Sequence, residues 1–315
     1  MKIKHGLFLS ALVLLIFITA CTTGSGGGTP TSTKAFLGGQ KGLALDFFPQ
    51  APPDFVFDTN YPFSINLRVE NVGEWDVAAG DAVFTVTGIN PTDFGVSAAD
   101  LQANSPDELL GAQRDPNGNV IQGTVTNVEF PNLQYAGAVA GQVQFNVKVE
   151  GCYKYGTKTQ VQLCILEDFL GRRGETSACN PNEEKTAENS GGPVHVTSFS
   201  ESVVGSNKLS FFFTLRHVGD GRAYAPGTHC STELSDRDKV KITLTDPGLG
   251  DLSCSGLEGG ALEGLATLYQ GERSIRCTLT VADENLRDYE TVLPIVIEYD
   301  YKDSVEVPLV VKHGS

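Results

Sequence analysis

Two stretches of the sequence share one pattern and decide the expected fold. Residues 63–74 read FSINLRVENVGE, and residues 209–220 read LSFFFTLRHVGD. Each is a run rich in apolar residues that enters a Val-Gly-acidic turn, and the two runs begin 146 positions apart (209 − 63). In residues 63–70 apolar and polar side chains alternate, which is the period of a half-buried strand. We therefore expect a strand and a turn at both places.

A second match at the same offset indicates an internal repeat. Residues 153–155 read YKY and residues 299–301 read YDY, and they are again 146 positions apart (299 − 153). The segments TQVQLCI and VEVPLVV that come after them stay in register at this offset. Two separated matches at one offset predict a duplicated domain. We expect the repeated tyrosines to pack near a hairpin, because aromatic side chains bury large apolar areas.

Short alternating runs of the same kind recur along the chain between turn residues. They include VQFNVKVE at residues 143–150, KITLT at 241–245 and VEVPL at 305–309. The exception is residues 97–110 (SAADLQANSPDELL), where we expect one or two short helical turns. Alternating strands separated by Gly, Pro, Asn and Asp are typical of antiparallel β-sandwiches. The sequence therefore predicts an all-β chain.

The repeat also suggests where the domains begin and end. We expect two tandem Ig-like antiparallel β-sandwiches at residues 35–168 and 193–315, with a polar, Gly-rich linker at 169–192. The strand followed by Asn-Val-Gly-Glu (residues 71–74) resembles Ig-like surface modules, in particular the cell-adhesion-related domain of bacteria and archaea. The second unit departs from that pattern, because His217 replaces the asparagine. The resemblance implies an Ig-like fold and adds no residue-level activity.

The amino terminus has the three zones of a secretory signal. Lys2 and Lys4 form a short positive region, residues 7–18 are almost wholly apolar (LFLSALVLLIFI), and small residues follow. The apolar run falls short of the ~20 residues that an untilted membrane span needs. We expect residues 1–20 to be a cleaved signal peptide, and the alternative is an uncleaved amino-terminal anchor.

Residues 18–21 (Ile-Thr-Ala-Cys) resemble the lipobox of prokaryotic lipoproteins. The resemblance implies that a diacylglyceryl group is attached to the Cys21 thiol and that a peptidase cuts directly before Cys21. Two or more acyl chains suffice for stable anchoring. Residues 21–34, rich in Gly, Ser and Thr, would then form a flexible tether, since this composition cannot build a core. We expect an exported lipoprotein that is anchored on the extracytoplasmic face of a membrane.

Six cysteines remain once Cys21 carries lipid, and an even number in an exported chain indicates disulfides. We expect Cys254 to pair with Cys277, because they flank one loop. We also expect Cys164 to pair with Cys179, because they are close in the chain. The partners of the other two, Cys152 and Cys230, stay open. No cysteines have the spacing of a zinc site, and we expect neither a metal nor a cofactor.

The composition and the motifs exclude several classes of function. Removing residues 1–20 takes away Lys2 and Lys4, so the net charge changes from −15 to −17. An acidic body is unsuited to nucleic acid, because it would be repelled by the phosphate backbone. The sequence contains no nucleophile elbow, phosphate-binding loop or HExxH motif, and its carboxylates are dispersed. We therefore expect no catalytic residues.

Two classes of function remain. The first is a non-catalytic, lipid-anchored cell-surface module for binding, adhesion or spacing, whose partner is a protein or a surface glycan. Trp75, which follows the first Val-Gly-acidic turn, is the candidate binding residue. The alternative is a secreted, lipid-anchored hydrolase with its site in the insertion at residues 91–131. A pocket lined by His, Asp or Glu around residues 93–107 would favour the enzyme, and an exposed Trp75 would favour binding.

Overall fold

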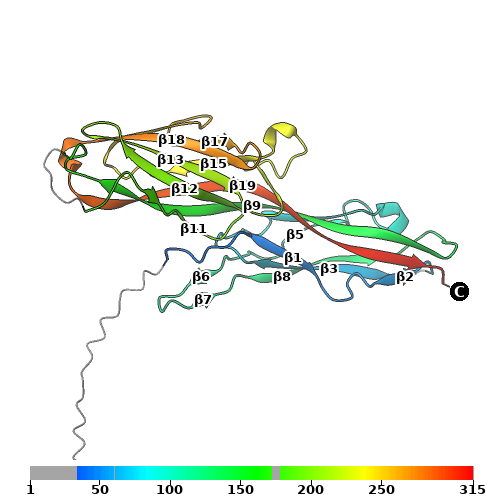
Figure 1. Ribbon diagram of the computed structural model, residues 1–315. Helices are drawn as coiled ribbons and strands as arrows, with labels where there is room; N and C mark the ends of the chain where they lie inside the picture. Colours follow the sequence, from blue (N-terminus) through cyan, green and yellow to red (C-terminus); the bar gives the residue numbers. More distant parts are fainter. Residues whose placement is uncertain (1–33, 60, 172–177, 315) are drawn as a thin grey trace, which may run out of the picture. The chain divides into compact units, whose positions relative to one another are not determined.

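Alternating burial along the strands shows why this sequence folds as β-sheet. The computed structural model describes residues 34–59, 61–171 and 178–314 (Figure 1). In β3 (Phe63–Asn71) every second side chain from Ile65 onward is buried, as the alternation in the sequence predicts. Strands dominate the described residues, and no helix among them is long and apolar enough to cross a membrane. The prediction of an all-β chain is confirmed.

The signal peptide at residues 1–20 and the lipidated Cys21 lie outside the described residues, as does the tether up to residue 33. Within residues 97–110 the chain forms a short turn at residues 98–101, where the Asp100 amide donates to the Ser97 carbonyl and the Gln102 amide to the Ala99 carbonyl, both at 3.2 Å. A 3₁₀ helix, η1 (Pro91–Phe94), comes before this segment, and Pro91 presets its backbone for a helical start. The other 3₁₀ turns in the described residues are η2 (Leu234–Asp236) and η3 (Asp283–Asn285).

Two small sheets pack against different parts of one large sheet (Figure 1). The three-stranded sheet has the order β1 (Leu43–Phe47), β3, β8 (Val125–Leu133). The five-stranded sheet has the order β10 (Glu184–Lys185), β12 (Val194–Val203), β13 (Lys208–His217), β18 (Glu272–Val281), β16 (Gly250–Ser255). A separate hairpin consists of β6 (Gln113–Arg114) and β7 (Val120–Ile121).

The large sheet has nine strands. Its main path is β17 (Glu263–Thr267), β15 (Lys239–Leu244), β19 (Tyr289–Lys312), β9 (Gln142–Ile165), β4 (Ala82–Thr87), β5 (Gln102–Asn104). The strands off this path are β2 (Phe55–Phe57), β11 (Glu188–Asn189) and β14 (Arg222–Tyr224). Two sandwiches result, because the three-stranded and the five-stranded sheets each cover part of the large sheet.

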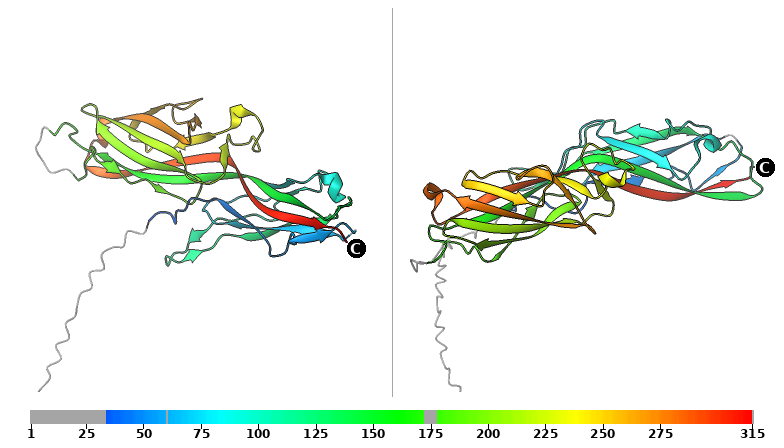
Figure 2. Two further views of the ribbon diagram at one scale, coloured as in Figure 1. Left: turned by 45° about the vertical axis from the view of Figure 1, so that its right-hand side comes forward. Right: turned by 90° about the horizontal axis from the view of Figure 1, so that it is seen from above.

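Two 24-residue strands, β9 and β19, run through both sandwiches. They pair antiparallel over their whole length, from Gln142 opposite Lys312 to Ile165 opposite Tyr289. The first half of β9 pairs with β4 and its second half with β11. The first half of β19 pairs with β15, and its end pairs with β2. Each strand therefore leaves one sandwich and enters the other, as the views in Figure 2 also show.

This arrangement differs from a division into contiguous units at 35–168 and 193–315. Residues 155–165 contribute to the second sandwich and residues 303–312 to the first. Beyond the tyrosine motifs one face is buried again, at residues 157–165 of β9 and at Leu309 and Val311 of β19, so the end of each strand packs into the other sandwich. The segment expected as a linker contributes β10 and β11, and the chain from Lys34 onward clusters as one compact unit.

The pairing of β9 with β19 places equivalent residues of the repeat opposite each other. Lys154 pairs with Asp300, and these two residues are 146 positions apart (300 − 154). The flanking tyrosines pair across the strands as Tyr153 with Tyr301 and Tyr155 with Tyr299. A local two-fold axis therefore passes between Lys154 and Asp300 and relates the two repeats at this point.

The four tyrosines of the repeated motifs form one buried cluster around this axis. Neighbouring ring centroids are between 5.7 and 6.4 Å apart. The Tyr153 hydroxyl accepts a hydrogen bond from the Leu43 amide at 3.2 Å, and the Tyr299 hydroxyl lies 2.9 Å from that of Thr157. Burial raises the pKa of all four phenols above its ordinary value. The expectation that these tyrosines serve packing is confirmed.

The Val-Gly-acidic turn recurs in the sequence because it packs against this tyrosine cluster. A Cβ atom added to Gly73 would run into the Tyr155 hydroxyl, and one added to Gly219 would run into the Tyr301 hydroxyl. Only glycine leaves room for so close an approach of a side chain to the backbone. The two matches in the sequence, the Val-Gly-acidic turn and the tyrosine motif, therefore contact each other in the structure. The contact is made once in each repeat, between Gly73 and Tyr155 and between Gly219 and Tyr301.

The residue two positions before each of these glycines binds the same tyrosine. The Tyr155 hydroxyl donates to Asn71 Oδ1 at 3.2 Å, and His217 Nε2 lies 3.0 Å from the Tyr301 hydroxyl. Burial lowers the pKa of His217, which favours its neutral form. His217 therefore has the same structural role as Asn71, although the two side chains differ.

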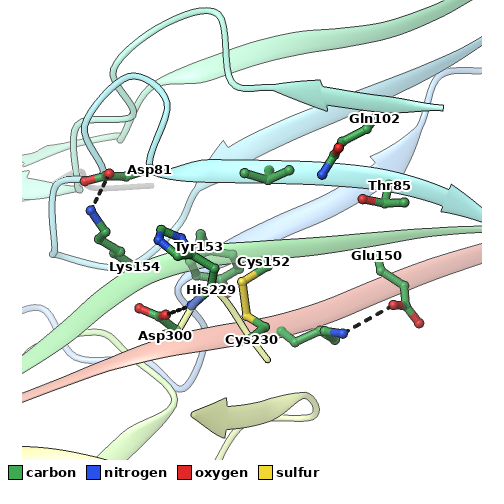
Figure 3. Close-up of a pocket in the computed structure, with 12 residues that line it drawn as sticks. Asp81, Thr85, Gln102, Glu150, Cys152, Tyr153, Lys154, His229, Cys230 and Asp300 are labelled. Atoms are coloured by element: carbon green, nitrogen blue, oxygen red, sulfur yellow. Dashed lines mark hydrogen bonds and ion pairs between the residues drawn. A yellow bond between two sulfur atoms is a disulfide. The ribbon is translucent and has the colours of Figure 1, made fainter. Parts of the chain in front are cut away.

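One disulfide joins the two repeats. Cys152 of β9 is bonded to Cys230, which lies in the loop after β14 (Figure 3). The two cysteines are 78 positions apart, and no local pattern favours their pairing, which the sequence analysis left open. Because Cys152 is two residues from Lys154, this covalent bond lies beside the local two-fold axis.

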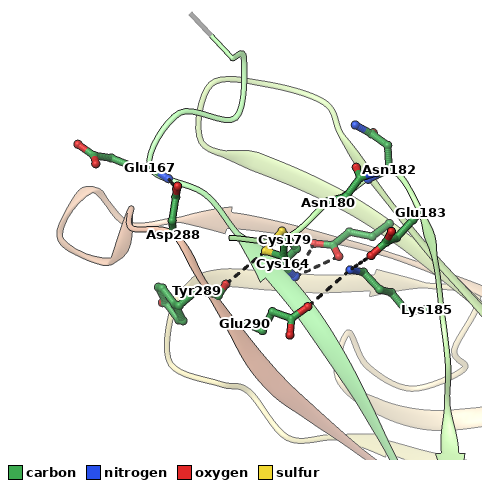
Figure 4. Close-up of a disulfide and its surroundings, with 11 residues drawn as sticks. Cys164, Glu167, Cys179, Asn180, Asn182, Glu183, Lys185, Asp288, Tyr289 and Glu290 are labelled. Carbon is green, nitrogen blue, oxygen red and sulfur yellow. Dashed lines mark hydrogen bonds and ion pairs between the residues drawn. A yellow bond between two sulfur atoms is a disulfide. The ribbon is translucent and has the colours of Figure 1, made fainter. Parts of the chain in front are cut away.

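The other two disulfides are local, and they are the pairings that the sequence favours. Cys254 is bonded to Cys277, which connects β16 to β18. Cys164 is bonded to Cys179, which connects the end of β9 to the segment before β10 (Figure 4). Both fix the edge of a sheet within the second sandwich.

Candidate binding pocket on the shared sheet

A pocket lies on the outer face of the nine-stranded sheet, away from the core of the first sandwich. In β4 the side chains of residues 82, 84 and 86 are buried, so those of Val83 and Thr85 point outward. In β9 the odd-numbered residues from 149 to 153 are buried, so Glu150, Cys152 and Lys154 point outward. These outward side chains form the floor of the pocket.

The pocket has a volume of about 460 Å³, which lies within the usual range of small-molecule sites. Strand β5 forms one wall through Gln102, and the loop after β14 forms the other (Figure 3). The side chains that give the pocket its polar character are Asp81, Thr85, Gln102, Glu150, Lys154 and His229.

The wall formed by the loop after β14 is held to the floor by three bonds. One is the Cys152–Cys230 disulfide. The others end on the buried Asp300 carboxylate, which accepts hydrogen bonds from the amides of His229 at 2.6 Å and Gly227 at 3.1 Å. His229 and Cys230 both have a φ of 51°, a left-handed conformation that non-glycine residues rarely adopt. These bonds hold the loop in that conformation and fix the His229 ring beside the floor.

The ionised side chains on the floor form ion pairs. Lys154 Nζ lies 2.6 Å from Asp81 Oδ1, and this hydrogen bond raises the pKa of Lys154. Lys302 Nζ lies 3.5 Å from one oxygen of Glu150, and Lys148 Nζ lies 2.9 Å from the other. The hydrogen bond from Lys148 holds the pKa of Glu150 below its usual range. The floor therefore carries charges of both signs side by side.

This arrangement suits hydrogen bonding to a ligand better than proton transfer. A general acid needs a carboxyl whose pKa is raised toward the working pH, and the pKa of Glu150 is shifted in the opposite direction. In the part of the chain that the structure describes, no group of three or more His, Cys, Asp or Glu side chains could hold a metal ion. What the pocket offers is a set of donors and acceptors that point into one space.

Trp75, the binding residue proposed from the sequence, lies outside this pocket. Its half-buried ring packs on Gly156 of β9, so closely that an added Cβ there would collide with it. Its amide donates to the Tyr155 hydroxyl at 3.4 Å, and Lys158 Nζ lies 5.5 Å from the centroid of its ring. Trp75 thus contacts the shared strand β9 on several sides, as a packing residue does.

The insertion at residues 91–131 contributes one side chain, Gln102, to the pocket. Phe94 of this insertion is buried, with its ring 5.1 Å from that of Phe145. Asp115 Oδ1 accepts hydrogen bonds from the amides of Asn117 and Asn119, which closes the turn between β6 and β7. The insertion therefore serves mainly to cover the first sandwich.

Sequence reasoning did not bring the members of the pocket together. Asp81, Glu150 and His229 come from three separate parts of the chain, and only long-range strand pairing and a disulfide make them neighbours. One signal was present in the sequence. The repeated tyrosine motifs YKY and YDY differ at their central residue, Lys154 against Asp300, which are both part of this site.

A scan against protein-family models gives no match for this chain, and a search of curated proteins finds no similar sequence.

Proposed function

We propose that this protein is an exported, lipid-anchored surface module that binds or spaces its partners without catalysing a reaction. The observation that carries the proposal is the continuous pairing of β9 with β19 through both sandwiches. Sandwiches joined only by a linker move relative to each other, whereas two sandwiches that share strands must break ladder hydrogen bonds to bend. A body of this kind can hold the surfaces of its two sandwiches in a fixed arrangement relative to each other.

The disulfides and the amino terminus support the proposed location. Three disulfides in the described residues indicate an oxidising, extracytoplasmic compartment. The lipobox-like residues 18–21 support a lipid on Cys21. About 13 residues separate Cys21 from the start of the described body at Lys34.

The alternative, a lipid-anchored hydrolase with its site in residues 91–131, has less support. The pocket takes only Gln102 from that insertion. Its two floor carboxylates, Asp81 and Glu150, are ion-paired with lysines. The hydrogen bond from Lys148 lowers the pKa of Glu150, which favours its charged form over the protonated form of a general acid.

The lipidated protein displayed on vesicles tests the proposal. Mass spectrometry should find acyl mass on the wild type that the Cys21→Ser variant lacks. Vesicles with the wild type should adhere to washed cells or cell-wall fragments of the producing organism, and an excess of the soluble Cys21→Ser protein should compete. A wild type without acyl mass would contradict the anchor. Release of soluble product from the cell wall by the protein would favour the hydrolase.

A further inference from the structure

We propose that the pocket on the shared sheet binds a neutral, hydroxyl-rich saccharide of one or two sugar rings. This inference rests on the proposed function, and it assigns a site and a ligand class to the binding module. It is carried by the geometry of the outer face of β4, β5, β9 and β19 and by the loop that Cys152–Cys230 holds over that face (Figure 3).

The charge arrangement selects a neutral ligand. Asp81 is paired with Lys154, Glu150 is paired with two lysines, and Asp300 is satisfied by backbone amides. A ligand with a charge of its own would compete with the partner that each of these ions already has. A neutral ligand can instead hydrogen-bond to the remaining lone pairs and protons while the pairs stay intact.

The mixture of donors and acceptors matches hydroxyl groups. A hydroxyl both donates and accepts, so adjacent sugar hydroxyls can bridge a carboxylate oxygen and a nearby ammonium proton at the same time. The floor offers such neighbours in Asp81 beside Lys154 and in Glu150 beside Lys302. Ligands that lack this alternation of donor and acceptor would satisfy only half of each pair.

Three further side chains are available for the ligand. Among the described residues, the Thr85 hydroxyl, the Gln102 amide and the His229 ring form no hydrogen bond within the protein. They come from three different elements that surround the same space: β4, β5 and the loop after β14. Polar groups that point into one pocket from several elements usually fix the orientation of a bound ligand.

The floor also provides an apolar strip for the C–H face of a sugar ring. Val83 and the Cys152–Cys230 disulfide line the pocket between the two ion pairs. A sugar ring has one face of C–H groups and a rim of hydroxyls, so it gains from burying the former while the latter are hydrogen-bonded. The disulfide therefore has two roles here, because it is both a lining group and the bond that holds the wall.

Titration of the ¹⁵N-labelled Cys21→Ser protein tests the inference. The probes are four neutral disaccharides (cellobiose, maltose, lactose and N,N′-diacetylchitobiose), with the tripeptide Gly-Gly-Gly and inorganic phosphate as comparison. At least one disaccharide should give saturable amide shifts confined to the pocket, with a Kd of about 1 mM or lower. Gln102→Ala and the isosteric Thr85→Val should each weaken this binding about fivefold.

Gln144→Ala is the matched control, because Gln144 is an exposed residue on the same face of β9 outside the pocket. It should leave the affinity within about twofold. The inference would be overturned by no saturable shift with any disaccharide up to about 20 mM, by shifts outside the pocket, or by a response to the peptide or phosphate alone. Such a result together with intact vesicle adhesion would overturn this pocket assignment and leave the proposed function standing.

Discussion

At the scale of single residues, a few close contacts explain the most repeated features of the sequence. Gly73 and Gly219 recur because a tyrosine hydroxyl from the shared strands lies against each of them. The partner of that hydroxyl varies, since Asn71 serves in the first repeat and His217 in the second. The glycine position therefore accepts no side chain, because there is no space for one. The position two residues before it needs only a side chain that can hydrogen-bond to the tyrosine hydroxyl.

We expect Gly73→Ala and Gly219→Ala each to lower the free energy of unfolding by about 1–3 kcal/mol, because the added methyl group overpacks a rigid contact. Gly205→Ala is the control, since its added Cβ would approach only Lys208, with the nearest atom at 3.3 Å. Urea denaturation of the three variants measures the difference. Equal stability of Gly73→Ala and Gly205→Ala would show that the tyrosine contact does not constrain the turn.

A buried carboxyl in the second sandwich gives stability a defined pH dependence. Glu201 of β12 is 4% exposed, and its two carboxylate oxygens lie 3.2 and 3.1 Å from the Cys164 amide, which donates to them. Burial raises its pKa to about 7 from an ordinary value of 4.5, while the Cys164 amide and Lys185 act in the opposite direction. Lys185 itself is ion-paired with Glu183 and Glu290 (Figure 4).

The sign of the effect follows from the raised pKa. Folded protein binds this proton more tightly than unfolded protein, so the contribution of Glu201 is largest below pH 4.5 and is lost as the pH rises to about 7. We expect Glu201→Gln to flatten the decline over this range and to raise the free energy of unfolding at about pH 8 by roughly 1–3 kcal/mol. Denaturation across the pH range measures this decline, with Glu129→Gln on the exposed side of β8 as the control. If the free energy of unfolding of Glu201→Gln still declines over this pH range, the decline is due to another titrating group.

At the scale of elements, the disulfides differ in how much chain they close. Cys152–Cys230 closes a loop with a sequence separation of 78, against 23 for Cys254–Cys277 and 15 for Cys164–Cys179. Loop closure restricts the unfolded chain more as the loop grows. The bond between the repeats should therefore contribute most.

We expect the double variant Cys152→Ser/Cys230→Ser to lose about 4 kcal/mol of stability and Cys164→Ser/Cys179→Ser about 3 kcal/mol. Both double variants avoid leaving a free thiol. Guanidinium denaturation of each against the wild type gives the comparison. A smaller loss for the bond between the repeats would mean that β9 and β19 already hold the loop after β14 without it.

The sequence predicted the strands better than their pairing, for reasons that particular residues show. Residues 63–70 alternate plainly, so β3 could be recognised from its own pattern. The middle of β9 hides its burial, because Thr157 and Thr159 are polar and yet buried. Their hydroxyls are satisfied by Tyr299 and Asn189, which are distant in sequence. The whole of β9 was therefore assigned to the first domain, which was expected to end at residue 168, although the strand passes into the second sandwich beyond the tyrosines.

The binding pocket was harder to predict than the fold. Its floor depends on the register between β4, β9 and β19, and its wall depends on the pairing of Cys152 with Cys230. Neither is encoded in a local motif, since both join residues that are far apart in the chain. The even number of cysteines predicted disulfides, and proximity favoured the two local ones, but no local pattern singled out the bond that shapes the pocket.

At the scale of the whole molecule, the shared strands make the two sandwiches one body. The core side chains of both sandwiches attach to β9 and β19, so loss of packing in one sandwich loosens strands that the other needs. Tandem domains that are merely linked would unfold independently. Cooperative unfolding across both repeats is the property on which the proposed surface module depends.

Hydrogen exchange of the Ile65→Ala variant tests this claim most directly. Ile65 of β3 is fully buried in the first sandwich, and its truncation should cost about 2–5 kcal/mol. We predict that amides of β3 and of β13, in the second sandwich, lose the same amount of protection free energy, because both open in one cooperative unit. Loss of protection in β3 with unchanged protection in β13 would contradict the account.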